Sequence, residues 1–183
     1  MADKNKGNPV SDQSKRWMEN ALLKLMQTDN YHEITIQEIA YQAGLSRRTF
    51  YRNYTSKDEI LEGYFYRIWE EYRALIIQET DFSLANIARV FFTKMQEYKD
   101  FLTLANRQQL LPFFLTRVDE LLPIAFYEAR GDTLPFSRET IQYILAFSAG
   151  GFMRILILWL KDGAKKSPEE MAAIVEDFNT MVK

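Results

Sequence analysis

Residues 35–57 read TIQEIAYQAGLSRRTFYRNYTSK, and the interpretation of the whole chain starts from this segment. Thr35, with a glutamate three residues later, forms a capping box, which predicts that a helix starts there. Gly44 can adopt the left-handed conformation that ends a helix in a tight turn. Only Leu45 separates this glycine from Ser46, which can cap a second helix. Two short helices joined by so tight a glycine turn are typical of a helix-turn-helix motif.

The second helix of this motif presents a basic outward face. At about 100° per residue, an inward-pointing Phe50 places Arg48 and Arg52 on the opposite side. The flanks carry Arg47, Thr49 and Tyr51. No acidic residue lies in the segment 45–57, whereas solvated helices usually mix charges of both signs. Arginine reads guanine edges, and threonine, tyrosine and lysine hold phosphates, so the face predicts binding in a DNA groove.

The charge distribution supports contact with DNA at one end of the chain. The net charge is −2 over 183 residues, but residues 1–57 carry nine Lys or Arg and six Asp or Glu, which gives +3. The remaining residues therefore carry −5. A weakly basic head on an acidic body suits a protein that meets DNA only through its head.

Outside the motif the pattern is helical throughout. No alternating run bounded by turn residues indicates a strand. Ser56 with Glu59 and Ser167 with Glu170 form two further capping boxes. Helices are expected at residues 14–28, 36–43, 47–53, 57–79, 84–98, 99–109, 112–129, 137–161 and 168–182.

These helices predict an all-α fold with two parts. Residues 14–58 form a three-helix, N-terminal DNA-binding head with the helix-turn-helix. Residues 59–183 form a larger helical body, and residues 1–13 form a disordered arm. The junction lies inside the long helix at 57–79, so we expect the orientation of the head to follow the conformation of the body.

Composition argues against catalysis and against bound metals or cofactors. The chain has no cysteine and one histidine, His32, so neither a thiolate nucleophile nor a multi-histidine metal site is available. No nucleophile–base pair or phosphate loop is recognisable. We therefore expect no catalytic residues, no metal and no cofactor, and the chain is predicted not to be an enzyme.

One apolar stretch is long enough to span a bilayer. It runs over residues 141–160 and includes Arg154, which would be costly in the middle of a membrane. A helix buried in the core or in a dimer interface explains the stretch better. The N-terminus has no signal-peptide pattern. We expect a cytoplasmic protein without a membrane partner.

Residues 35–57 resemble the DNA-binding segment of the TetR/AcrR family of bacterial regulators. The family pattern is I-A-x-x-A-G, a hydrophobic residue and serine, then T-hydrophobic-Y-x-x-F and a lysine three residues later. The matching positions are Ile39, Ala40, Ala43, Gly44, Leu45, Ser46, Thr49, Phe50, Tyr51, Tyr54 and Lys57. Tyr54 replaces the more common phenylalanine, a mild change. The specific match covers about residues 15–60, and beyond it only the helical body, its length and the segment 159–170 resemble the family.

The resemblance implies roles for individual residues of the head. Tyr51 and Lys57 match phosphate-contacting positions, and Thr35 and Ser46 lie at helix starts next to the DNA backbone. Lys15 is a further candidate for a phosphate contact, although a solvated surface lysine explains it equally well. The positions expected to read bases are Arg47, Arg48, Thr49 and Arg52, of which Arg52 could also contact a phosphate.

The resemblance also implies a homodimer on a pseudo-palindromic, double-stranded operator, formed through the last two helices. The helix at 137–161 supports this because it is apolar over more of its circumference than a surface helix needs. Expected interface residues are Phe152, Ile155, Leu156, Trp159, Ile174 and Phe178.

The body is aromatic-rich, which in the family indicates a pocket for an apolar or aromatic effector that releases DNA, as in a repressor. For any single aromatic residue, ordinary core packing is the more common explanation. The candidate pocket residues are Trp69, Tyr98, Phe101, Phe114, Tyr127, Tyr143 and Phe147. The alternative is a DNA-binding co-regulator whose body binds a protein partner and holds no small molecule.

Overall fold

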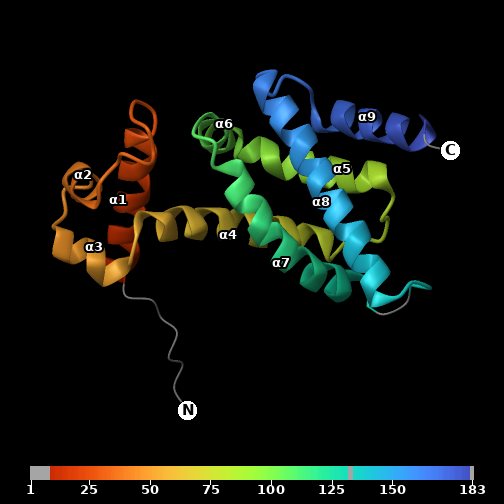
Figure 1. The fold of residues 1–183 in the computed structure, drawn as a ribbon, viewed down its shortest axis with the longest axis horizontal. Helices are drawn as coiled ribbons and strands as arrows, with labels where there is room; N and C mark the ends of the chain where they lie inside the picture. The colour runs from red at the N-terminus through yellow and green to blue at the C-terminus, as the bar shows by residue number, and fades with distance from the viewer. Residues whose placement is uncertain (1–8, 132–133, 182–183) are drawn as a thin grey trace, which may run out of the picture. The chain divides into compact units, whose positions relative to one another are not determined.

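The computed structural model describes residues 9–131 and 134–181. Within these residues the chain forms helices and turns and no strand, which confirms the predicted all-α fold. The helices are α1 (Pro9–Leu25), α2 (Ile36–Gln42), α3 (Arg47–Asn53), α4 (Lys57–Ile76), α5 (Leu84–Glu97), α6 (Lys99–Arg107), α7 (Leu111–Arg130), α8 (Arg138–Lys161) and α9 (Pro168–Met181) (Figure 1).

The chain divides into two compact units, Met1–Tyr66 and Arg67–Lys183, which we call the head and the body. Their boundary falls inside α4, later in this helix than the boundary after residue 58 expected from the sequence.

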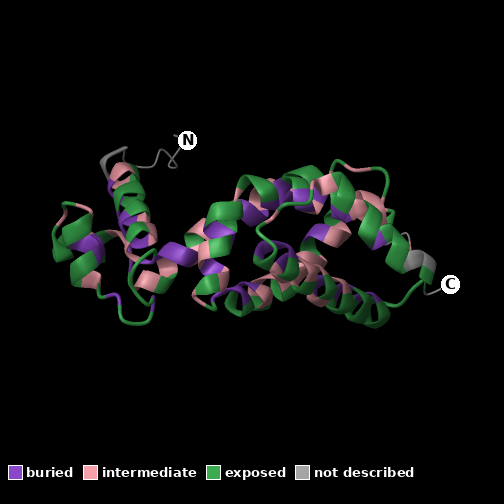
Figure 2. Cartoon of the chain, turned by 90° about the horizontal axis from the view of Figure 1, so that it is seen from above, coloured by how far each residue is buried: buried purple, intermediate pink, exposed green. Residues whose placement is uncertain are grey.

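The head is a three-helix unit in which α1, α2 and α3 pack against one another. Each helix buries apolar residues on its inner side, and the buried positions follow the helical period (Figure 2). The fully buried side chains include Met18, Leu22 and Met26 from α1 and the turn after it, Ile39 from α2, Phe50 from α3 and Ile60 from the start of α4. A core built from all three helices holds α3 in place and leaves its opposite face free.

Capping interactions explain why the helices begin where they do. Thr35 and Glu38 form the predicted reciprocal box, with the Thr35 N–H donating to Glu38 Oε2 at 2.8 Å. Ser167 and Glu170 form the second. The third predicted capping box, Ser56 with Glu59, is wrong in one of its two hydrogen bonds. Glu59 N donates to Ser56 Oγ, but the Glu59 carboxylate accepts from Thr55, at 2.6 Å from its N and 2.9 Å from its Oγ1.

Helix α1 begins at Pro9, earlier than the expected residue 14, so residues 9–13 are not a disordered arm. Proline is tolerated at a first helical position because the N–H that it lacks would be unpaired there. The Ser11 hydroxyl also donates to Asn53 Oδ1 at 2.6 Å, which ties the first turn of α1 to the end of α3. The rest of the expected arm, residues 1–8, lies outside the described residues.

The body packs α5 against α9 and α7 against α8, while α6 contacts α5, α7 and α8. Aromatic rings connect these helices. Phe92 of α5 meets Trp159 of α8 at 5.5 Å between ring centroids, and Phe91 meets Phe152 at 5.2 Å. Phe91 also contacts Tyr72 of α4 at 5.8 Å, so the second half of α4 belongs to this core.

Helix α8 is long and apolar enough to cross a membrane by length and composition, a test that the core helix of a soluble protein also passes. One side of α8 is buried within the chain, through Ile141, Leu145, Ala149, Leu156, Trp159 and Leu160. The opposite side exposes Tyr143, Phe147 and Leu158. Its apolar character therefore exceeds what packing within this chain uses.

Candidate nucleic-acid interface

The turn between α2 and α3 has the geometry that its glycine predicts. Gly44 has φ +67°, a left-handed conformation that few residues other than glycine adopt readily. The Leu45 N–H donates to the Ala40 carbonyl at 2.8 Å, and the Gly44 N–H donates to the Tyr41 carbonyl at 3.0 Å. These are the paired bonds of a Schellman motif, which ends α2 and redirects the chain into α3.

Helix α3 presents its arginines to solvent. Arg47, Arg48 and Arg52 are all exposed, while Phe50 is fully buried on the opposite side. Within the described part of the chain, none of the three guanidinium groups has a hydrogen-bond or ion-pair partner. A guanidinium without a protein partner keeps all its donors for a ligand such as a guanine edge or a phosphate.

The other polar residues of the motif are partly committed to local structure. Ser46 Oγ accepts from the Thr49 N–H at 3.1 Å and lies 3.0 Å from Thr49 Oγ1, so both side chains help to cap α3. Thr35 Oγ1 donates to Glu38 Oε2 at 2.8 Å. The two hydrogen bonds from Thr35, from its backbone and its side chain, hold the pKa of Glu38 below its ordinary value. Tyr51 is exposed to solvent on the flank of α3.

Lys15 and Lys57 have different surroundings. Lys15 is exposed, with its Nζ 5.7 Å from the centre of the Tyr54 ring. Lys57 is half-buried, and its Nζ donates to three backbone carbonyls, of Tyr31 at 2.6 Å, His32 at 3.1 Å and Ile34 at 2.8 Å. These bonds were not expected from the sequence. A phosphate contact by Lys57 stays a prediction, and it would compete with the carbonyls for the same three protons.

The expected pocket residues of the body do not form one set. Tyr143 and Phe147 are 72% and 75% exposed on the outer side of α8, so they do not line a pocket inside the protomer. Their role in a pocket stays a prediction, because aromatic composition does not tell which side of a helix faces inward. The Tyr98 hydroxyl donates to Glu71 Oε1 at 2.7 Å, and Tyr127 lies beneath the Arg138 guanidinium. The remaining three, Trp69, Phe101 and Phe114, are buried.

The expected interface residues include both buried and exposed side chains. Leu156 and Trp159 are buried within the chain, and Trp159 Nε1 donates to the Lys166 carbonyl at 2.9 Å. Phe152 and Ile155 are half-buried, while Ile174 and Phe178 of α9 are exposed. The outer side of α8 was not among the expected interface residues, and it carries Tyr143, Phe147, Gly151, Arg154 and Leu158 at helical spacing.

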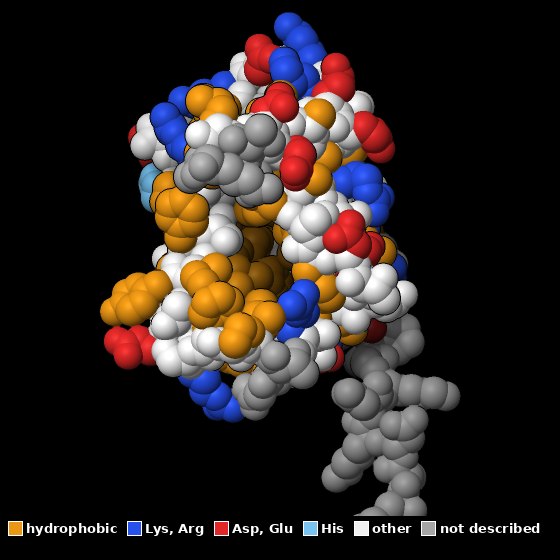
Figure 3. All heavy atoms as spheres, turned by 90° about the vertical axis from the view of Figure 1, so that its right-hand side faces the viewer, with side chains coloured by type: hydrophobic (Ala, Val, Ile, Leu, Met, Phe, Trp, Pro, Cys, Tyr) orange, Lys and Arg blue, Asp and Glu red, His pale blue; other side chains and the backbone are white. Residues whose placement is uncertain are grey.

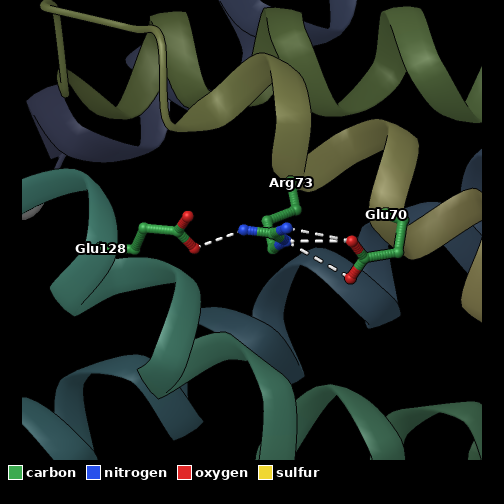
Figure 4. Close-up of polar contacts among 3 residues, drawn as sticks. All are labelled: Glu70, Arg73 and Glu128. Atoms are coloured by element: carbon green, nitrogen blue, oxygen red, sulfur yellow. Dashed lines mark hydrogen bonds and ion pairs between the residues drawn. The ribbon is translucent and has the colours of Figure 1, made fainter. Parts of the chain in front are cut away.

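An arginine ties α4 to α7 within the body. Arg73 lies between Glu70 of its own helix and Glu128 of α7, as Figure 4 shows. Its Nη2 donates to Glu70 Oε2 at 3.0 Å, and Nη1 forms an ion pair with Glu128. The two carboxylates, Glu70 first, raise the pKa of Arg73 above its ordinary value. A bidentate arginine fixes geometry better than a point charge, so this contact orders the end of α4.

Fold and surface thus define an all-helical DNA-binding regulator, and comparison with known proteins agrees. Residues 20–64 match the model of the bacterial regulatory proteins of the tetR family, and residues 83–180 match a transcriptional regulator C-terminal region. The chain therefore belongs to the TetR family of transcriptional regulators, a family of regulators rather than enzymes. Membership implies a soluble cytoplasmic protein.

Two solved structures share the fold at low sequence identity. The dihydroxyacetone kinase operon activator DhaS aligns with TM-score 0.55 and 20% identity, over 90% of this chain and 93% of its own. The fatty acid degradation regulator FadR from Bacillus halodurans aligns with TM-score 0.55 and 16% identity, over 94% and 95%. At these identities the likeness concerns the fold alone. No match was found among curated proteins.

Proposed function

We propose that the chain represses transcription by binding a pseudo-palindromic operator as a homodimer. The observation that carries this proposal is the exposed face of α3, where Arg47, Arg48 and Arg52 have no protein partner in the described residues. Arg48 and Arg52 read base edges together with Arg47 and Thr49. Tyr51 and Lys15 hold phosphates, with Thr35 and Ser46 at the helix starts beside the backbone.

The homodimer forms through the exposed sides of α8 and α9. Tyr143, Phe147 and Leu158 on α8, with Ile174 and Phe178 on α9, expose large apolar side chains. Large exposed apolar side chains mark interaction surfaces, and a two-fold axis would bring two copies of these residues together. The dimer would then present two copies of α3 to successive major grooves about one helical turn apart.

An apolar or aromatic effector is proposed to bind in the body and release the operator. On one face of the molecule, Figure 3 shows hydrophobic side chains gathered around a hollow. Buried aromatic residues of the body, among them Trp69, Phe101 and Phe114, would provide apolar contacts, and Tyr98 and Tyr127 would provide hydroxyls. In this proposal residues 14–58 serve DNA binding and residues 59–183 serve dimerisation and effector binding, while DNA binding itself places the protein at the nucleoid.

Substituting Arg48 tests the groove assignment. Arg48→Ala is expected to cost about 1–3 kcal/mol in operator binding and to relax the preference at one base position in each half-site. Binding measured against a set of single-base operator variants reports both effects. The control is Arg89→Ala, which removes an exposed arginine from α5 in the body. If Arg48→Ala keeps the parent affinity and base preference, α3 does not read the groove as assigned.

A further inference from the structure

The segment between α1 and α2 is tied to the first turn of α4 by two neighbouring side chains. Lys57 Nζ donates to the carbonyls of Tyr31 at 2.6 Å, His32 at 3.1 Å and Ile34 at 2.8 Å. The next residue, Asp58, accepts a hydrogen bond from the Tyr31 hydroxyl. We call Tyr31, Lys57 and Asp58, with the three carbonyls, the α4 clamp.

The clamp uses all the hydrogen-bonding capacity of the lysine. An ammonium group has three N–H donors, and three carbonyls accept them here. Nζ also lies 4.6 Å from the centre of the Tyr31 ring, within range of a cation–π interaction. Burial lowers the pKa of Lys57, while the charges of Asp58 and Glu38 act in the opposite direction. The hydrogen bonds to the three carbonyls offset the cost of desolvating the ammonium group. These carbonyls accept no hydrogen bond within a helix, because residues 31–34 lie outside α1 and α2.

The second half of the clamp is more deeply buried. Tyr31 is 3% exposed, and its ring makes an edge contact with His32 at 5.5 Å between centroids. Burial first, and the hydrogen bond to Asp58 second, raise the pKa of the Tyr31 hydroxyl above its ordinary value. The hydroxyl therefore stays a proton donor to Asp58 at neutral pH, so both ends of the tyrosine are fixed to α4.

The clamp acts directly before the helix-turn-helix in the chain. The Ile34 carbonyl belongs to the residue that precedes Thr35, the cap of α2. From Thr35 the chain passes through α2 and its glycine turn to α3. Lys57 is the first residue of α4. A shift in the first turn of α4 would thus reach the start of α2 through hydrogen bonds to the backbone.

We propose that Lys57 is a positioning residue, which supports operator binding by fixing the segment before α2 through the clamp and not by contacting a phosphate. This inference rests on the operator binding proposed above. The two roles differ in salt dependence. Losing one phosphate contact reduces the magnitude of the slope of log affinity against log salt concentration by about 0.9. Losing a positioning contact lowers the affinity and leaves this slope unchanged.

The test uses Lys57→Met in the full chain, which keeps the aliphatic stem and removes the ammonium. We expect operator affinity to fall about tenfold, as for a lost hydrogen bond to a charged group, with an unchanged salt slope. Lys24→Met, which removes a lysine from the end of α1, is the matched control for the loss of one positive charge. A salt slope smaller in magnitude by about 1.8 for Lys57→Met, which is about 0.9 for each subunit of the dimer, or an unchanged affinity, would overturn the proposal.

A second variant and a second readout keep the test independent of folding defects and of DNA. Tyr31→Phe removes only the hydroxyl bond to Asp58, and we expect a smaller loss of affinity, again at unchanged slope. Hydrogen exchange without DNA should show faster exchange of the amides of residues 33–36 in Lys57→Met, with the amides of α1 unchanged. Unchanged hydrogen exchange of the amides of residues 33–36 would contradict the clamp, whether or not the parent protein binds an operator. If the parent protein binds no operator, only the proposed function is contradicted.

Discussion

The Phe147→Asp variant is expected to be a folded monomer that loses operator binding at concentrations where the parent protein is fully bound. Phe147 lies on the outer side of α8, and the proposed two-fold axis would bury it in the dimer. An aspartate there would place an unpaired charge in an apolar interface, which costs several kcal/mol and is repeated in each subunit.

The loss of DNA binding follows from the loss of the dimer. A dimer binds its second half-site at high effective concentration, whereas each monomer binds one half-site alone, so operator affinity should fall by at least about a hundredfold. Sedimentation or light scattering gives the oligomeric state, and a gel-shift titration gives the affinity. The control is Ile124→Asp, which changes an exposed apolar residue of α7. A Phe147→Asp protein that remains dimeric and binds like the parent would exclude this side of α8 as the interface.

The Phe50→Ala variant is expected to unfold the head while the body stays folded and dimeric. The Phe50 ring is completely buried in the head core, and it contacts the rings of Tyr51 at 5.6 Å and Tyr54 at 5.9 Å. Truncating a buried phenylalanine costs about 3–5 kcal/mol, which is comparable with the whole stability of a unit this small.

Thermal unfolding followed by circular dichroism should show an early transition for Phe50→Ala, and operator binding should be lost at every salt concentration. Tyr41→Ala removes an aromatic ring from the exposed side of α2 and should leave the stability of the head unchanged. A Phe50→Ala head that unfolds together with the parent head would show that α3 is held by something other than this ring.

The helix positions were predictable because their signals are local. Thr35, Ser46 and Ser167 cap helices in the structure as their sequence context indicates. The exposed arginine face of α3 was predictable for the same reason, because one buried ring fixes the opposite side of a short helix. The error at Ser56 has a local cause too, since Thr55 precedes it and offers Glu59 both a backbone and a side-chain donor.

The interface and pocket residues were less predictable because α8 is apolar on both sides. Leu156 and Trp159 face the protomer core, while Phe147 and Leu158 face outward, and hydrophobicity alone does not separate these pairs. The spacing of Tyr143, Phe147, Gly151, Arg154 and Leu158 was a usable signal, because these residues share one side of a helix. The hydrogen bonds of Lys57 could not be predicted from the sequence, because their acceptors are backbone carbonyls more than twenty residues away.

The most direct test of the central claim, a dimer that reads operator DNA through α3, is a binding selection on genomic fragments with the purified full chain at near-physiological salt. We predict enrichment of a short pseudo-palindrome with half-sites about one helical turn apart. Failure to enrich any sequence, with only weak and salt-sensitive binding, would contradict the claim and would favour a co-regulator that needs a protein partner to find DNA.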